Sequence, residues 1–398
     1  MKAKDKTVLV ICHSYNSFQK DFTDEISKYF KKIYVFVRNN PFAEISKFIP
    51  VSSLDRFKID SKVDLSNKPS NVEVVLSPVF YGPFDFQYKK VVEKHFKSVE
   101  KIIEKKSIKF DLIFTHFLWS AGYVGAKLKE KYNVPFIAIG HGYDVYDLSF
   151  RDNIWRKKIE YVLNSADRAI TVSKKNVECI KKIDADVPVE VIPNGFRDDL
   201  FYPRDTIKCR KKLGLPINKK IILNVGNMIE IKGHKYLIKA MAKVVESRDD
   251  VMCIIIGSGH LKNNLKKQIK ILELGDYVKL CGRKAHNEMP IWMNAADLFV
   301  LPSLNEGNPT VMFEALGCGK PFIGTKVGGI PEIINNKKPG YLVEAKDVDQ
   351  LSTNILRALE TEWNSKYIYN YARKFTWKSI VKEIMKVYES LFETSEVL

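Results

Sequence analysis

The chain reads Leu298-Phe-Val-Leu-Pro-Ser-Leu-Asn-Glu306-Gly-Asn-Pro-Thr-Val-Met-Phe-Glu314 between residues 298 and 314. Four apolar residues that suit a buried strand come first, and a Gly-Asn-Pro turn separates them from a segment that suits a helix. We therefore expect Glu306 on a loop at the strand's carboxyl end and Glu314 about two turns into the helix. Amides at a helix start bind phosphate, and carboxylates accept hydrogen bonds from sugar hydroxyls. A nucleotide sugar carries both kinds of group.

The same alternation of short apolar runs and longer amphipathic segments continues along the whole chain. It is typical of parallel sheets with crossover helices. The predicted strands of the first half are Thr7–Cys12, Lys32–Val37, Val72–Ser77, Asp111–Thr115, Pro135–Gly140, Arg168–Val172 and Val189–Ile192. Those of the second half are Lys220–Val225, Val251–Ile256, Val278–Cys281, Asp297–Leu301, Pro321–Thr325 and Gly340–Val343. The pattern predicts an α/β protein with two similar-sized domains, each built on a doubly wound parallel sheet.

The length of 398 residues also favours two or three domains. We place the first domain at residues 1–197 and the second at residues 220–375. A charged segment with two prolines, residues 198–219, is the predicted linker, and residues 376–398 have the apolar spacing of a final helix.

Composition limits the cell compartment and the partners. The formal net charge is +18 and is spread through both halves, which favours phosphorylated substrates, acidic lipid or nucleic acid, or simply reflects solvated lysines. The six cysteines are scattered without a C-x-x-C pair, as in cytosolic proteins with reduced thiols. No run reaches the roughly 20 apolar residues of a membrane helix. We expect a cytoplasmic protein, either soluble or peripheral on the cytoplasmic membrane face.

Two further candidates follow strands of the second domain. Gly226 and Gly233 permit tight turns on either side of Lys232, whose ammonium group would reach a diphosphate as a point charge. The alternative for Lys232 is an ordinary solvated lysine at a helix start. Arg283 follows another strand and is a candidate for a loop that contacts a nucleobase.

The first domain has a histidine in a comparable position. His141 lies between Gly140 and Gly142 at the end of a strand, where it can face a crevice and bond a sugar hydroxyl or the reacting centre. The alternative is a histidine that bonds its own loop. His116 ends a neighbouring strand, but the aromatic residues after it favour a packing role.

Together these segments resemble a known family. Residues 301–332 resemble the signature of family 4 retaining glycosyltransferases, which have the GT-B fold of two Rossmann-like domains facing across a cleft. Val191-Ile-Pro-Asn-Gly195, Val225-Gly-Asn-Met228 and His141-Gly-Tyr-Asp144 are similar to further motifs of that family, as is Lys232-Gly. The resemblance covers nearly the whole chain.

The resemblance implies a role for each matching residue. Glu306 would contact the hydroxyls of the donor sugar, Glu314 the nucleotide ribose, and Lys232 the leaving diphosphate. Gly226 and Asn227 would form the phosphate-binding turn, amides around Asn308, Thr310 and Val311 would hold sugar and phosphate, and His141 would line the reacting face. The resemblance also implies a hexosyltransferase-type reaction with retention at the anomeric carbon. It implies no metal cofactor, which agrees with the lack of an Asp-x-Asp pair.

Three departures from the family pattern affect these expectations. Asn227 stands where the family usually has an arginine, so binding of the leaving group would rest more on Lys232 and helix dipoles. Pro309 has no N–H to donate. The first strand leads into His13-Ser-Tyr-Asn-Ser-Phe18 instead of a glycine-rich loop.

The expected partners are a nucleotide-sugar donor and a glycan, lipid-linked or other cell-surface acceptor, as in polysaccharide or glycolipid synthesis. Residues 88–106 read as a basic helix with Val92, Phe96, Val99 and Ile103 on one side. One hypothesis is that this helix contacts an anionic membrane. The alternative is an apolar face buried on the sheet and a solvated basic face.

Two other functions fit parts of the sequence. A glycan phosphorylase or a nucleotide-sugar epimerase would use the same fold. A non-catalytic scaffold or nucleic-acid-binding protein is suggested by the charge alone, and basic motifs interleaved with aromatic residues are not apparent, so nucleic acid is not an expected partner.

Overall fold

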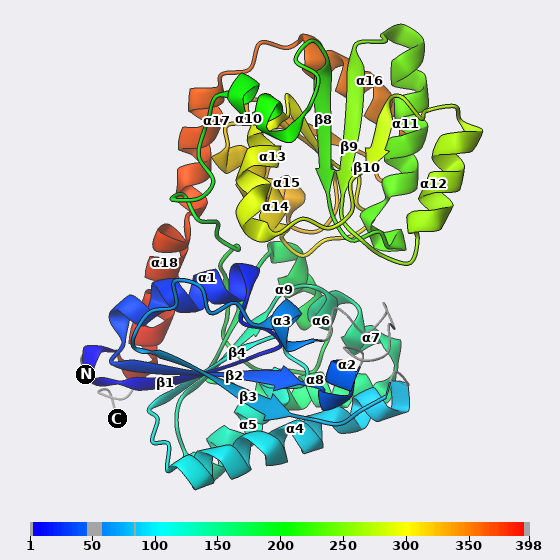
Figure 1. Cartoon of the computed structure of the whole chain (residues 1–398). Coiled ribbons are helices and arrows are strands. Elements are labelled where there is room, and N and C mark those ends of the chain that lie inside the picture. The colour runs from blue at the N-terminus through cyan, green and yellow to red at the C-terminus, as the bar shows by residue number, and fades with distance from the viewer. Residues whose placement is uncertain (1–2, 46–57, 83–84, 394–398) are drawn as a thin grey trace. The chain divides into compact units, whose positions relative to one another are not determined.

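The computed structural model describes residues 3–45, 58–82 and 85–393. The chain forms two compact units, each with its own parallel sheet (Figure 1). The first unit comprises the residues up to Pro193 together with those from Ile380 onward, and the second comprises Asn194–Ser379.

The first unit is built on a seven-stranded sheet of order β3-β2-β1-β4-β5-β6-β7, with every neighbouring pair parallel. Its strands are β1 (Thr7–Cys12), β2 (Lys32–Asn39), β3 (Val72–Pro78), β4 (Leu112–His116), β5 (Phe136–Gly140), β6 (Arg168–Thr171) and β7 (Val189–Val191). Its helices are α1 (Ser17–Ile26), α2 (Pro41–Ile45), α3 (Ile59–Lys62), α4 (Asp85–Lys106), α5 (Ala121–Tyr132), α6 (Tyr143–Tyr146), α7 (Leu148–Arg151), α8 (Asn153–Ser165), α9 (Lys174–Ile180) and most of α18 (Trp377–Glu393).

Helices cover this sheet and explain why its strands are continuously apolar. Parallel strands that are covered on both faces lose the alternation of polar and apolar residues. Val99 of α4, Val124 of α5 and Ile159 of α8 are fully buried in the core with the strands. The apolar side of α4 is thus buried, as the alternative interpretation of residues 88–106 held, while Lys97 and Lys101 are exposed.

The second unit repeats the arrangement with six parallel strands in the order β10-β9-β8-β11-β12-β13. They are β8 (Lys220–Val225), β9 (Val251–Ile256), β10 (Val278–Leu280), β11 (Leu298–Leu301), β12 (Phe322–Thr325) and β13 (Gly340–Val343). The helices are α10 (Thr206–Leu213), α11 (His234–Ser247), α12 (Lys262–Ile271), α13 (Met289–Ala295), α14 (Thr310–Gly317), α15 (Ile330–Ile333), α16 (Val348–Glu360) and α17 (Ser365–Ala372).

Both faces of the second sheet are buried under helices. Successive side chains of a strand point to opposite faces, and Ile221 and Leu223 of β8 accordingly pack with α13, α14 and α17, whereas Ile222 packs with α11 and α16. The α/β, doubly wound parallel-sheet class expected from the sequence is confirmed for both units.

The domain limits differ from the predicted ones. The segment predicted as a linker packs within the second unit, because α10 contacts α13 and the buried guanidinium of Arg210 donates to the main-chain oxygens of Ala295 and Ile217. The final helix belongs largely to the first unit, where Tyr388 packs edge-on against Phe30. Within the described ranges, none of the helices has both the length and the hydropathy needed to cross a bilayer.

Candidate active site

The candidate site of the second unit lies where its strand order reverses. β8 has β9 on one side and β11 on the other, so the loops after β8 and β11 leave the carboxyl edge of the sheet at its switch point. Ligands of open α/β sheets bind at such a point. Residues 226–233 and 302–309 form these two loops.

The loop after β8 ends in a glycine that no other residue can replace without strain. Gly233 has φ +66°, and a Cβ added there would lie 1.9 Å from the main-chain oxygen of Pro302. The close approach brings the 3₁₀ turn Glu230–Lys232 against the loop after β11. Gly226 lies in a bend of the chain, but its φ is outside the left-handed region and a Cβ there would meet Lys232 only at 3.6 Å.

Glu306 and Lys232 meet at the switch point. The Lys232 Nζ lies 2.6 Å from Glu306 Oε1, and the hydroxyl of Ser303 donates to the same oxygen at 2.6 Å. Glu306 is only 7% exposed. Gly328 fixes the loop from the other side, since it has φ +52° and a Cβ there would lie 1.7 Å from the Glu306 main-chain oxygen. The carboxylate is therefore held in one place, with a cation beside it.

Glu314 is the fifth residue of α14, about one turn into the helix, not two. The helix begins only at Thr310 because Pro309 occupies its N-cap with extended backbone. His286, on the segment between β10 and α13, lies with Nε2 3.0 Å from Glu314 Oε1. The carboxylate is buried, and a hydrogen bond to the imidazole orients it.

Thr310 and Val311, whose amides we expect to hold sugar and phosphate, lie at the start of α14. Thr310 and Val311 are the first two helical residues, whose N–H groups have no acceptor within an α-helix. Asn308 is engaged by Asn194, which donates from its main-chain nitrogen to Asn308 Oδ1 at 3.1 Å and from Nδ2 to the Asn308 main-chain oxygen at 2.7 Å. The side chain of Asn308 thus holds the loop to the segment after β7.

Two predicted donor-binding residues lie on exposed loops nearby. Asn227 follows β8, and Arg283 follows β10. The two loops are joined through the turn after β9, because Gly257 donates its N–H to the main-chain oxygen of Gly282 at 2.9 Å. Gly226 in turn donates to Ile256 at 2.9 Å. Arg283 is therefore at the same sheet edge as Lys232.

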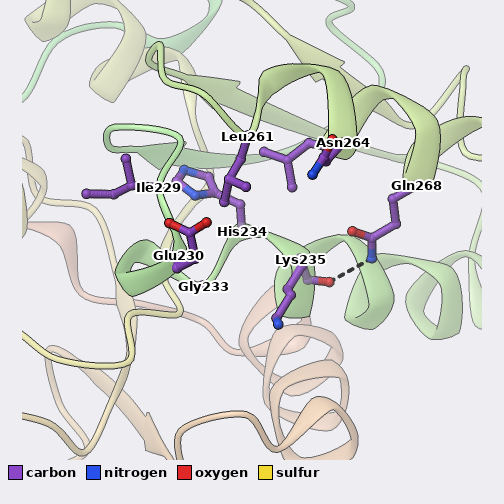
Figure 2. A pocket seen from close by; sticks show the side chains of 9 residues that line it. Ile229, Glu230, Gly233, His234, Lys235, Leu261, Asn264 and Gln268 are labelled. Carbon is purple, nitrogen blue, oxygen red and sulfur yellow. Dashed lines mark hydrogen bonds between the residues drawn. The ribbon is translucent and has the colours of Figure 1, made fainter.

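A pocket of about 260 Å³ lies next to the loop after β8, between α11 and α12 (Figure 2). The side chains of Ile229, Glu230, His234 and Leu261 line it. Burial lowers the pKa of His234 to about 4, so its imidazole is neutral. Lys232, Glu306 and Glu314 do not line this pocket, and no pattern in the sequence predicts it.

His141 lies in the first unit, at the carboxyl end of β5. Its Nε2 is 2.9 Å from His116 Nδ1, so one ring donates to the other. Burial holds the pKa of His116 well below its usual range, and His116 is neutral. The His116 position matches the packing role we expected, since its ring is buried and meets Phe22 edge-on at 4.5 Å.

Asp144 positions the loop that carries His141. Its buried carboxylate accepts the N–H groups of His141 at 3.1 Å, Gly142 at 3.0 Å and Leu118 at 2.8 Å. Burial raises the pKa of Asp144 to about 6, although these hydrogen bonds oppose the shift. The histidine loop after β5 is thereby attached to the loop after β4.

The structure thus brings Lys232, Glu306, Glu314 and the start of α14 to one edge of the second unit, and places His141 in the first unit. Sequence reasoning missed Ser303, His286 and Asn194, which hold these groups. Ser303 lies three residues before Glu306 and gives a local signal, whereas the other two come from distant segments. In the described part of the chain there is no group of three or more His, Cys, Asp or Glu side chains that would hold a metal ion.

Comparison with known proteins identifies the family. The family model described as Glycosyl transferases group 1 matches residues 205–375, and that of Glycosyltransferase Family 4 matches residues 60–200. An uncharacterised glycosyltransferase of Methanocaldococcus jannaschii is 30% identical over 305 residues, which cover 74% of this chain and 79% of the relative. The chain belongs to glycosyltransferase family 4. It is therefore an enzyme of the glycosyltransferase class, and the non-catalytic alternative is set aside.

Other relatives of this glycosyltransferase agree with that assignment. The D-inositol 3-phosphate glycosyltransferase of Corynebacterium jeikeium is 28% identical over 317 residues, covering 74% of this chain and 75% of the relative. A crystal structure of Anabaena HepE in complex with UDP-glucose has a TM-score of 0.74 at 21% identity and covers 97% of this chain and 100% of its own. The structural likeness shows the fold, which is GT-B.

Proposed function

We propose that this glycosyltransferase moves a sugar from a nucleotide-diphosphate sugar to an acceptor hydroxyl, with retention at the anomeric carbon. One observation carries the proposal: Lys232 and Glu306 meet beside the start of α14, at the switch point of the second sheet. The site offers positive charge for a diphosphate and a fixed carboxylate for sugar hydroxyls within one small region.

The chemistry follows from where charge develops. As the bond from sugar to phosphate breaks, negative charge grows on the leaving diphosphate, and donors that already point at it lower the barrier. Lys232 and the first amides of α14 would supply this stabilisation, and no metal ion is required for it. A diphosphate would compete with Glu306 for the Lys232 ammonium, which would leave the Glu306 carboxylate available to the sugar.

The remaining residues would orient the reactants. Glu314, oriented by His286, would accept hydrogen bonds from the ribose hydroxyls. Arg283 would contact the nucleobase of the donor. His141 would line the reacting face from the first unit, where Asp144 positions its loop. Such positioning in itself contributes a large part of the rate of a two-substrate reaction.

The comparisons support a nucleotide-sugar donor and an acceptor that carries an acidic group. The structural neighbour HepE was crystallised with UDP-glucose. The name of one relative specifies inositol 3-phosphate, and that of a Bacillus anthracis relative specifies L-malate. A glycan or lipid-linked acceptor at the cytoplasmic membrane face remains the broader proposal, in which the exposed lysines of α4 would contact anionic lipid.

A thermal-shift screen of nucleotide-diphosphate sugars, with UDP-glucose included, tests the donor site. A donor that binds only the folded chain raises the unfolding temperature. We expect one donor to stabilise the wild type and Glu314→Ala to abolish the shift. Glu362→Ala, which removes an exposed carboxylate of the same unit, should leave the shift unchanged.

Transfer is then measured with the radiolabelled donor. Label in an acceptor that appears only when both substrates are present supports the proposal. Conversion of the donor without any acceptor would indicate an epimerase, and dependence on orthophosphate would indicate a phosphorylase. If no nucleotide sugar shifts the unfolding temperature or is consumed, the proposed function is wrong.

A further inference from the structure

The first unit buries an arginine at the carboxyl edge of its sheet. Arg38 is the penultimate residue of β2 and is 4% exposed. Its Nη1 donates to the hydroxyl of Ser120 at 2.8 Å, and its guanidinium lies 4.8 Å from the ring centre of Trp119. The buried Nε has no hydrogen-bond partner in the described part of the structure. The arginine is thus held by neutral groups.

A buried lysine lies beside Arg38. Lys62, the last residue of α3, is 8% exposed, and its Nζ donates to the main-chain oxygen of Arg38 at 2.7 Å. Burial, and next the charge of Arg38, lowers the pKa of Lys62 to about 7. The pair lies close to the switch point of the first sheet, because β2 neighbours β1 and β1 neighbours β4.

Imidazoles, not carboxylates, surround this pair. His95 of α4 is buried between the hydroxyls of Ser77 and Ser120, at 3.1 and 2.9 Å. His13, after β1, stacks on Phe117 with ring centres 4.8 Å apart, and its buried Nε2 has no partner among the described residues. Burial lowers the pKa of His13 most, and the charges of Arg38, Lys62, His95 and His141 lower it further, so these four groups lie within electrostatic reach of His13.

Neither cation has a carboxylate partner among the described residues. No Asp or Glu forms an ion pair with Arg38 or Lys62, and none is among the groups that shift their pKa values. Asp144, a buried carboxylate at this edge, already accepts hydrogen bonds from three main-chain N–H groups. Buried charges in proteins are normally paired, because leaving water without a counter-charge is costly. Two adjacent cations without one therefore indicate a missing anion.

We infer that Arg38 and Lys62 bind the acidic group of the acceptor, a phosphate monoester or a carboxylate. The inference rests on the proposed function, since it assigns the acceptor to the unit that carries His141. Arginine and lysine both form charge-assisted hydrogen bonds to such groups. The hydroxyl of Ser120, the N-cap of α5, forms hydrogen bonds with Arg38 and His95, and the backbone of Ser120 has φ +54°. Backbone strain of this kind is found at ligand sites.

A purely structural role for the pair makes a different prediction. If Lys62 serves only to tie α3 to β2, then Lys62→Met removes a tether, lowers the unfolding temperature and leaves anion binding intact. If the pair is an anion site, Lys62→Met removes an amine whose charged form burial disfavours, and the unfolding temperature without anion stays the same or rises.

The test is a titration of the full chain with inorganic phosphate at constant ionic strength, followed by calorimetry and by thermal shift. Lys232→Met removes the cation of the donor site, and the response to phosphate should persist in it. Adding Lys62→Met to that variant should weaken phosphate binding roughly 10-fold or more, the loss expected of one charge-assisted hydrogen bond. Lys62→Arg keeps the charge and should keep the binding. The control Lys182→Met removes an exposed lysine of the same unit and should change nothing.

The outcomes separate the two proposals. Phosphate binding that Lys62→Met leaves unchanged, or that disappears in Lys232→Met alone, overturns the acceptor inference and leaves the donor proposal standing. Failure of the proposed function would instead remove the donor response and leave the Lys62-dependent phosphate response in place. A parallel titration with malonate identifies the class of acceptor: tighter binding of phosphate assigns a phosphorylated acceptor, and tighter binding of malonate assigns a carboxylate. If neither anion binds, the inference is wrong.

Discussion

The ammonium of Lys62 links the stability of the first unit to pH. Its pKa is about 7 in the folded chain, against a usual value of 10.5. Between these values the unfolded chain binds a proton that the folded chain does not, so unfolding takes up a proton. The free energy of unfolding should therefore rise with pH in this window, by at most about 1.4 kcal/mol per pH unit for one group.

Urea unfolding of the wild type and of Lys62→Met at pH 7 and pH 9 measures this contribution. The rise should be present in the wild type and smaller in the variant. Cys12 lowers the free energy of unfolding above pH 9, because burial raises the pKa of its thiol to about 12 in the folded chain. In that range the thiol of the unfolded chain loses its proton first. That effect occurs in both proteins. Equal pH dependence in the two would contradict a buried, titrating Lys62.

At this scale the sequence predicts residue types better than residue partners. Glu306 and Lys232 were expected at one site because each follows a strand, and the sheet order brings those strands together. The hydrogen bond from His286 to Glu314 could not be expected, since 28 positions and a change of element separate the two residues. Arg38 is visible as a charge at the end of an apolar strand, but a pattern cannot show that it has no counter-charge.

Prediction from the sequence succeeds best for the secondary-structure elements. Buried parallel strands give apolar runs that can hardly be mistaken, and all thirteen predicted strands occur. Their starts were set one residue too early at Asp111, Pro135, Asp297 and Pro321. The reason is physical: the carboxylates of Asp111 and Asp297 accept the main-chain N–H groups of Thr7 and Ile221 and so serve as caps, while proline has no N–H for the ladder.

The loop that carries Glu306 depends on a glycine from another element. Gly328→Ala would place a methyl group against the Glu306 main-chain oxygen and must displace the loop. We expect a loss of donor affinity of tenfold or more, equivalent to at least about 1.4 kcal/mol, measured by calorimetry with the donor found in the screen.

Gly214→Ala is the matched control. Gly214 ends α10 with φ +65°, but a Cβ there meets nothing within 4 Å. Both variants should lose about 1 kcal/mol of stability from the left-handed backbone, and only Gly328→Ala should lose donor affinity. Wild-type affinity in Gly328→Ala would show that the loop does not fix the carboxylate.

For the whole molecule, the sequence predicts how many units exist but not which unit each segment joins. Amphipathic spacing shows that α10 and α18 bury one face, but gives no indication of where. The boundary was placed too late because Pro203 and Pro216 suggest an extended linker, whereas Phe196 donates to the Phe375 main-chain oxygen and begins the second unit. Helix α18 starts in that unit at Trp377 and joins the first at Ile380.

Because α18 starts in the second unit and continues in the first, the position of a core residue predicts which unit its substitution will destabilise. Tyr388 is 2% exposed and packs against Phe30 with ring centres 5.3 Å apart, so Tyr388→Ala should destabilise the first unit by roughly 3 kcal/mol or more. Ile368 is fully buried in the second unit, and Ile368→Ala should destabilise that unit alone.

Hydrogen exchange followed by mass spectrometry measures the local stability of both units in one sample. In Tyr388→Ala we expect faster exchange only in the first unit, that is, up to Pro193 and from Ile380 onward, and in Ile368→Ala only in residues 194–379. Exchange that rises equally throughout in both variants would mean that the chain opens as one cooperative body, and donor binding could then no longer be assigned to a unit that stays folded by itself.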